Sequence, residues 1–260
     1  MSARRAGTLI TGLTVLTVML PGCTAGSTLP QGGDPVALDP ADFTTDIDNP
    51  WFPMTPGTRW TYRELDADLG ALTVVVTVTD QTKVVADGIE ARVVRDTVSH
   101  EGEILEDTFD WYAQDAKGAI WYLGEDTAEF DQGRVTSRAG SFEAGVDGAL
   151  PGIAVPADPA PGMTYRQEYY KGHAEDEGTV LSVDELVEAP YGQFDGALLT
   201  RDTNALEPDA SELKFYVRGV GPVLTLDASG GSGREELLTV TTVPAGTATQ
   251  PLGTAEKTRE

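Results

Sequence analysis

Two segments of this chain resemble each other at a spacing of about 105 residues, and this echo limits the folds open to it. Residues 56–62 read PGTRWTY and residues 161–165 read PGMTY. The tripeptide Arg-Asp-Thr at 95–97 recurs at 201–203, and Asp-Trp-Tyr at 110–112 corresponds to Lys-Phe-Tyr at 214–216. We therefore predict two pseudo-equivalent halves, about 56–124 and 161–227. Chance similarity between two runs of strands is the alternative.

Each half reads as a run of β-strands. Residues 72–80, LTVVVTVTD, are rich in β-branched side chains, which favour strands over helices. Turns at Asp87-Gly88 and Glu101-Gly102 separate the strands expected at 89–98 and 104–115. Further strands are expected at 120–123, 223–226 and 235–243. Alternation along the third strand predicts that Trp111 faces the core and that Tyr112 is half-exposed.

Short loops between consecutive strands predict antiparallel meanders, and no segment carries a helical apolar stripe. The predicted fold class is all-β, a single domain over residues 49–244 built as one curved sheet or a sandwich. Residues 125–162 are a long crossover rich in Gly and Pro. We expect this crossover to pack over one sheet face and to cover its concave side.

The N-terminus carries an export signal. Arg4 and Arg5 precede an apolar run over 6–20 that is too short to span a bilayer. Residues 20–23, LPGC, resemble a bacterial lipobox, which implies a signal peptide over 1–22, cleavage before Cys23 and a lipid on its thiol. Two alternatives stay open, a secreted form cleaved elsewhere and a buried core thiol. Cys23 is the only cysteine, so no intrachain disulfide can form.

The charge of the chain restricts its partners. It has 42 acidic and 18 basic residues, a net charge of −24, which repels nucleic acids. We expect solubility outside the cell to explain most of this charge, with calcium binding as the alternative. Composition predicts a flexible tether over 23–48 and a disordered tail over 245–260.

Residues able to support chemistry are few. His100 and His173 fall in predicted turns, and no Gly-x-Ser-x-Gly elbow is present, so a catalytic triad and a zinc site are not expected. Asp107 and Asp110 share a strand but should point to opposite faces, which argues against a carboxylate pair for hydrolysis. The acidic run at 175–177 reads as a solvated turn. We predict no catalytic residue, no metal and no cofactor.

Aromatic side chains are the remaining candidates for ligand contact. They are more simply explained as core, but a cleft between the halves or under the crossover would be lined by some of them. The candidate ligand-binding residues are Trp60, Tyr62, Trp111, Tyr112, Trp121 and Tyr165.

Four motifs resemble a family of bacterial secreted proteins and lipoproteins that has no established activity. They are DNPWFP (48–53), DWYAQDAKGAIWYLGE (110–125), GSFEAGVDGALPGI (140–153) and YRQEYYKGHAED (165–176). The resemblance spans about residues 48–227 and implies a lipoprotein, but it assigns no chemistry to any residue.

These observations predict a non-enzymatic protein of the cell envelope, anchored to the membrane by the lipid on Cys23. Its partner would be another envelope protein or an unknown small ligand, apolar or sugar-like. The first alternative is an extracellular hydrolase that uses carboxylates. The second is a structural lipoprotein that binds no small ligand.

Overall fold

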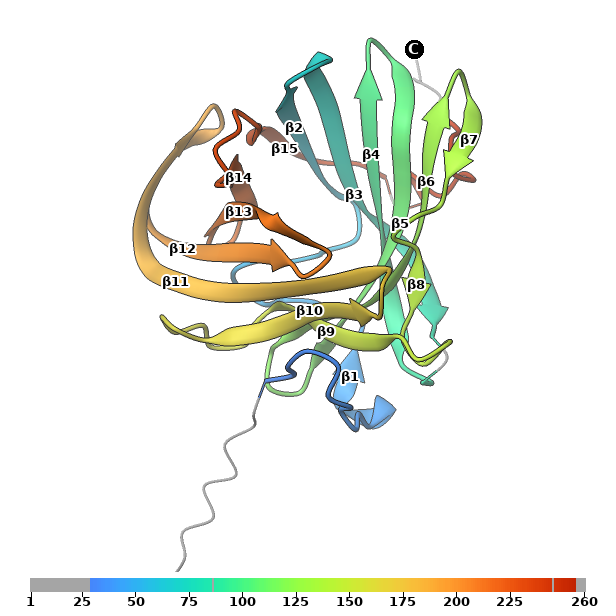
Figure 1. Cartoon of the computed structure of the whole chain (residues 1–260), viewed down its shortest axis with the longest axis vertical. Helices are drawn as coiled ribbons and strands as arrows, with labels where there is room; N and C mark the ends of the chain where they lie inside the picture. Colours follow the sequence, from blue (N-terminus) through green and yellow to red (C-terminus); the bar gives the residue numbers. More distant parts are fainter. Residues whose placement is uncertain (1–28, 86, 245, 256–260) are drawn as a thin grey trace, which may run out of the picture.

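The computed structural model describes residues 29–85, 87–244 and 246–255, and it is built almost entirely from antiparallel strands (Figure 1). The single 3-10 turn of this part, η1, spans Pro40–Asp42. The strands are β1 (Phe43–Thr44), β2 (Thr58–Asp66), β3 (Gly70–Val84), β4 (Glu90–His100), β5 (Glu103–Asp115), β6 (Ile120–Asp131), β7 (Arg134–Ser137), β8 (Phe142–Glu143), β9 (Leu150–Val155), β10 (Thr164–Tyr170), β11 (Ala174–Ala189), β12 (Gly192–Asn204), β13 (Glu207–Val217), β14 (Gly221–Asp227) and β15 (Arg234–Thr242). No helix within these residues is long and apolar enough to cross a membrane.

The sheet closes on itself. Strand order runs β5-β4-β3-β2-β15-β14-β13-β12-β11-β10-β9-β6, and β6 also pairs with β5. The result is a closed antiparallel barrel of 12 strands with a few short additional strands. The all-β prediction is confirmed at this level, but neither an open curved sheet nor a sandwich forms. Closure removes the two edges that an open sheet would leave unpaired.

The crossover between the halves makes the closure possible. Strands β7, β8 and β9 all lie within residues 125–162, and β9 pairs with β6 on one side and β10 on the other. Gly152 lets the backbones of β9 and β10 come close together, since a Cβ at this position would lie 2.1 Å from the Gln167 carbonyl oxygen. The expectation that this segment covers a concave face was therefore wrong: part of it is a strand of the barrel wall.

The two similar segments begin with the same turn. The Gly57 amide donates to the Val78 carbonyl at 2.8 Å, and the Gly162 amide donates to the Val180 carbonyl at 2.8 Å. Each turn leads into a meander of five strands, β2 to β6 in one segment and β10 to β14 in the other. Equivalent sequence positions are thus used in equivalent ways at the start of each meander.

Residues 29–48 do not form the flexible tether expected from composition. Arg166 fixes their first part, because its Nη1 donates to the carbonyls of Gly32 and Asp34, both at 2.7 Å. Strand β1 then pairs with the end of β5. A buried guanidinium needs several acceptors, and the backbone of this segment supplies them. The predicted signal peptide and Cys23 lie outside the described residues.

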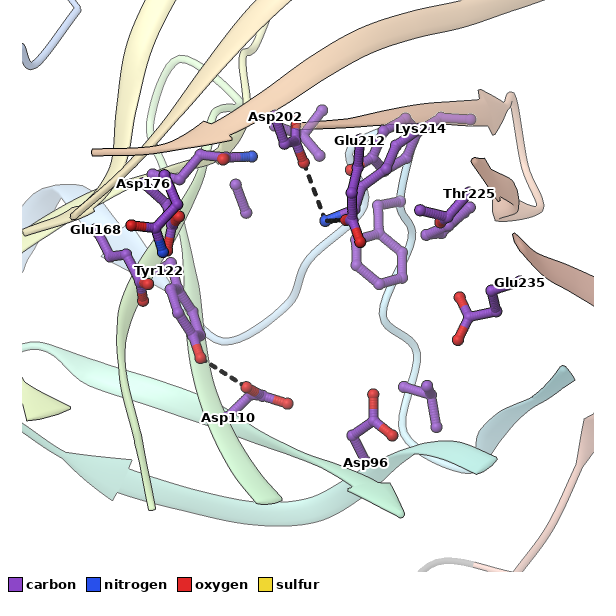
Figure 2. Close-up of a pocket in the computed structure, with 18 of the residues that line it drawn as sticks. Asp96, Asp110, Tyr122, Glu168, Asp176, Asp202, Glu212, Lys214, Thr225 and Glu235 are labelled. Atoms are coloured by element: carbon purple, nitrogen blue, oxygen red, sulfur yellow. Dashed lines mark hydrogen bonds and ion pairs between the residues drawn. The ribbon is translucent and has the colours of Figure 1, made fainter. Parts of the chain in front are cut away.

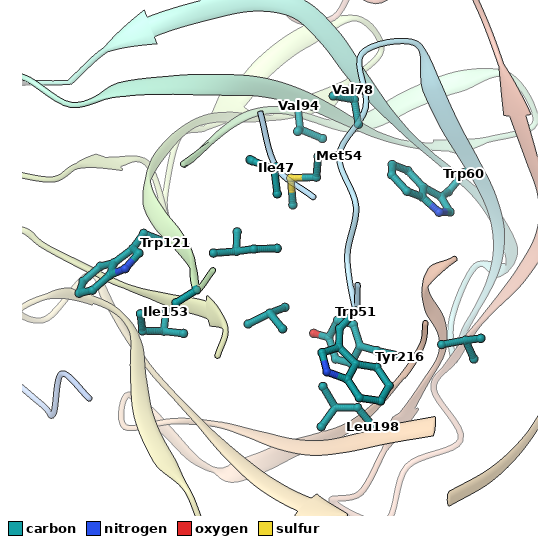
Figure 3. Packing of buried hydrophobic residues seen from close by; sticks show 14 of the residues in the cluster. Ile47, Trp51, Met54, Trp60, Val78, Val94, Trp121, Ile153, Leu198 and Tyr216 are labelled. Carbon is teal, nitrogen blue, oxygen red and sulfur yellow. The ribbon is translucent and has the colours of Figure 1, made fainter. Parts of the chain in front are cut away.

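The segment after β1 enters the barrel and fills part of it (Figure 3). Ile47, Trp51 and Met54 are almost fully buried, and they pack among side chains of the wall such as Val94 and Leu198. Burying a side chain of this size contributes about 1.5–3 kcal/mol. We call residues 47–54 the plug. The DNPWFP motif thus places Asn49 and Trp51 inside the barrel.

The C-terminal segment is also packed, although the sequence predicts a disordered tail. Arg95 and Asp107 form a buried ion pair, with side chains 3% and 0% exposed. The Gly253 amide donates to Asp107 Oδ2 at 2.7 Å, and Arg95 Nη2 donates to the Thr254 carbonyl at 3.0 Å. Buried charges require such partners, so they hold residues 246–255 against the barrel.

Candidate functional site

A cavity of about 540 Å³ occupies the part of the barrel that the plug leaves open. Its volume is in the range of small-molecule sites. Carboxyl side chains from strands on all sides line it, together with one basic side chain (Figure 2). These lining residues are Asp96, Asp110, Glu125, Glu168, Asp176, Asp202, Glu207, Glu212, Glu235 and Lys214. Glu207 and Glu212 are exposed, whereas Asp110 and Asp202 are buried, so the cavity extends from an acidic mouth inward.

Aromatic rings form the inner end of the cavity. Phe52 of the plug lies edge-on to Trp60, with ring centroids 5.5 Å apart, and 6.4 Å from the rings of Tyr112 and Tyr216. Tyr112 stacks on Tyr122 at 5.0 Å. The plug therefore supplies an apolar floor beneath a polar wall.

Two carboxyls on this wall share one hydroxyl. Tyr122 Oη lies 2.7 Å from Asp110 Oδ1 and 2.8 Å from Glu125 Oε2. A phenol has one proton, so it can donate to only one of the two oxygens. The second contact requires a protonated carboxyl. Burial, and then repulsion from Glu125, raise the pKa of Asp110 to about 8, so the Asp110–Glu125 pair keeps a proton at neutral pH.

Other carboxyls of the cavity also retain protons. Burial and a hydrogen bond with Asp176 raise the pKa of Glu168 to about 10. Burial and the charge of Glu64 raise the pKa of Glu235 to about 7. Taking several carboxylates out of water beside one another disfavours their ionised forms, and protons replace the missing counter-ions.

The aspartate of the repeated Arg-Asp-Thr, Asp96 in the first meander and Asp202 in the second, has different surroundings in each. Asp202 on β12 meets Lys214 on β13, with Nζ 3.0 Å from Asp202 Oδ2 and 3.4 Å from Glu212 Oε2. Burial lowers the pKa of Lys214, but these carboxylates raise it well above its usual value, so the ammonium stays charged.

Asp96 has no such partner. Its Oδ1 is buried without a hydrogen bond to any described residue, and the carboxyl points into the cavity (Figure 2). Burial, and then the charge of Asp110, raise the pKa of Asp96 well above the ordinary value. An unpaired buried polar atom is costly, which marks this place as one that a ligand group would complete.

A metal centre does not fit this arrangement. Within the described part of the chain, no group of three or more His, Cys, Asp or Glu side chains could hold a metal ion. The carboxyls are spread around the wall rather than converging on one point. The arrangement can instead contact a molecule at several separate places.

The cavity includes some of the residues predicted from the sequence and leaves others out. Tyr62 and Tyr112 line it. Trp60, Trp111, Trp121 and Tyr165 are buried but do not line it. Trp111 is buried in the core and Tyr112 is half-exposed, as expected. Tyr112 is nevertheless the one that lies on the cavity side, whereas Trp111 packs under Lys83 Nζ at 4.2 Å.

Sequence reasoning missed the acidic wall. Asp107 and Asp110 do serve different places, as expected, since Asp107 pairs with Arg95 while Asp110 lines the cavity. The echo of Arg-Asp-Thr at 95–97 and 201–203 contained the missing signal. Asp96 and Asp202 occupy the same position of the repeat, and the residues on either side of each point to the opposite face of the strand. An aspartate that recurs in this way indicates that the inner face of the sheet is polar.

Comparisons with known proteins give a likeness in backbone only. No family model matches this chain, and no curated protein matches it either. One similar structure is that of a protein from Bacteroides fragilis, which is inferred to be exported and has a YmcC-like fold. The match covers 74% of this chain and 99% of the Bacteroides chain, at 15% sequence identity and a TM-score of 0.45. Another is that of an inferred lipoprotein from Parabacteroides distasonis. This match covers 74% of this chain and 98% of the Parabacteroides chain, at 13% sequence identity and a TM-score of 0.39. At these values neither neighbour carries an argument about function, so the site must supply it.

Proposed function

We propose that this chain is a non-enzymatic binding protein that takes a small polar ligand into its barrel. The observation that carries the proposal is the 540 Å³ cavity, whose wall holds Asp96 with a buried oxygen left unpaired. Of the ligands expected from the sequence, an apolar one fits poorly, because an acyl chain would desolvate the carboxyls without bonding to them. A ligand with polar groups at several positions satisfies the wall.

The same proposal places the protein outside the cytoplasm, anchored by a lipid on Cys23. Its support is the LPGC sequence at 20–23 after a basic and apolar leader. Mass spectrometry of the membrane fraction should find an N-terminal fragment that begins at Cys23 and carries a diacylglyceryl group. Release of an unmodified chain from both wild type and Cys23→Ala would contradict the anchor.

Native mass spectrometry of protein purified from its own host tests ligand binding. We expect a bound small molecule on the wild type and none on Thr225→Trp, because an indole from this cavity-lining position fills the space. Thr239→Trp is the matched control, since Thr239 is exposed and does not line the cavity. A wild type that binds no small molecule, native or added, would contradict the proposal.

A carboxylate-dependent hydrolase is the second candidate. A carboxyl with a raised pKa, Asp110, lies beside another, Glu125, which is the pattern of a general acid and its partner. The Tyr122 hydroxyl occupies the space between them, however, where a scissile oxygen would have to sit. Turnover of aryl glycosides or esters by the wild type, lost in Asp110→Asn, would replace the binding proposal with this one.

A further inference from the structure

The cavity combines a large acidic wall with one internal counter-ion. Lys214 contacts Asp202 and Glu212, and the remaining carboxyls that line the cavity have no basic partner among its lining residues. The arrangement therefore has a surplus of acceptors over donors. A ligand that brings several hydrogen-bond donors and positive charge would offset both the surplus of acceptors and the excess of carboxyls over basic groups.

Strand register shows where one such charge belongs. Lys214 lies opposite Thr200, two residues before Asp202 on β12. Asp110 lies opposite Val94, two residues before Asp96 on β4. The first meander therefore has a carboxyl at the place where the second has its lysine. In their ionised forms Asp96 and Asp110 would repel each other, whereas Asp202 and Lys214 attract.

The shape of the wall favours an extended cation over a single ion. Asp96, Asp110 and Glu235 project from different strands, and the carboxyls do not converge on a common centre. The stacked rings of Tyr112 and Tyr122 also line the cavity, and aromatic rings attract ammonium groups and pack against methylene chains. Flexible chains of alternating ammonium and methylene groups carry both features.

We propose that the ligand of this cavity is an aliphatic polyamine, one ammonium of which occupies the space beside Asp96 and Asp110 that the Lys214 ammonium occupies beside Asp202. The inference rests on the proposed binding function and specifies its ligand class. Binding displaces the protons held by the wall, since a cation beside a carboxyl lowers its pKa. Neutral sugars satisfy the hydrogen bonds but displace no protons.

Titration calorimetry with spermidine tests this inference. Measurements at pH 7 in two buffers of different ionisation enthalpy should show binding with net proton release. Asp96→Asn should weaken binding by about tenfold or more, and Asp195→Asn, on the exposed face of β12, should leave it unchanged. Equal weakening by both variants would mean general attraction to an acidic surface and would overturn the proposal.

Asp110→Lys provides a second, constructive variant. The new ammonium should reproduce the pairing of Lys214 at Asp96, raise the unfolding temperature of the empty protein and abolish spermidine binding. Retained binding in this folded variant would overturn the polyamine assignment. Maltotriose and myristate are further probes: binding of either, without spermidine, would overturn the inference while leaving the binding function standing. Failure of all three probes, with no ligand seen in native mass spectrometry, would overturn both.

Discussion

At the scale of single residues, the interior is governed by the balance of charge inside the barrel. Asp202 and Lys214 form a closed pair, while Asp110, Glu125 and Tyr122 share fewer protons than they have acceptors. Both arrangements cost free energy to desolvate, but only the second leaves capacity for another molecule. The residues that stabilise the barrel and those that would bind a ligand are therefore distinct.

Replacing Lys214 tests this distinction. In Lys214→Met, Asp202 keeps its position but loses its counter-ion, and we expect the free energy of unfolding to fall by about 1–3 kcal/mol, reduced from a fully buried case because the lysine is partly exposed. Chemical denaturation with urea measures the change. Lys171→Met, at an exposed turn, serves as the control and should stay within about 0.5 kcal/mol of wild type. Equal stability of the two variants would show that the pair contributes nothing.

At the scale of elements, two segments that look like linkers act as structural parts. The plug enters the barrel, and residues 246–255 seal the Arg95–Asp107 pair on the outside of the wall. Residues 29–34, which precede the plug, and the C-terminal segment each supply hydrogen bonds to a buried charged group, Arg166 and Asp107 respectively.

The buried pair gives a prediction at this scale. Asp107→Ala leaves Arg95 buried without its partner and releases the Gly253 amide, so stability should fall by about 3–5 kcal/mol. Asp126→Ala removes an exposed pair with Arg138, whose side chains are 49% and 53% exposed, and should cost about 0–1 kcal/mol. Thermal unfolding of both variants makes the comparison. A similar cost for the two would contradict the sealed-pair description.

The sequence predicts the strands better than their arrangement. β-Branched runs and Gly turns locate β3, β4 and β5, because strand propensity and turn chemistry are local. Closure depends on β9 pairing with both β6 and β10, which involves contacts between distant residues and a close approach at Gly152. Which face of β5 points inward was also not evident, because Phe109 and Trp111 on one face are as bulky as Tyr112 on the other. Only the structure shows that the inner face carries the carboxyls.

At the scale of the whole molecule, the cavity makes stability depend on pH. The carboxyls with raised pKa values bind more protons in the folded chain than in the unfolded chain. Their contribution is therefore full below about pH 4, where both states are protonated, and is lost as pH rises through 7 to 8 and beyond. The net charge of −24 adds repulsion in the same direction.

This linkage predicts that the unfolding temperature of the empty protein falls between pH 5 and pH 8. For each such group, stability falls by about 1.4 kcal/mol over every pH unit in which the unfolded chain has lost the proton and the folded chain keeps it. This corresponds to roughly 3–6 °C per pH unit in a domain of this size. Scanning calorimetry across this range measures the slope, and Glu235→Gln should flatten it because the amide does not titrate. A rise in stability over the same interval would contradict the protonated interior.

Carbon-13 NMR of the side-chain carboxyls tests the central claim most directly, because it reports the protonation of each group. The account predicts that carboxyl resonances belonging to Asp110 and Glu235, assigned through Asp110→Asn and Glu235→Gln, titrate near pH 8 and pH 7 in the empty protein. The midpoints of both titrations should move to lower pH when spermidine is added. If every carboxyl of the folded chain titrated near pH 4, the cavity would hold no protons for a ligand to displace, and the account would be contradicted.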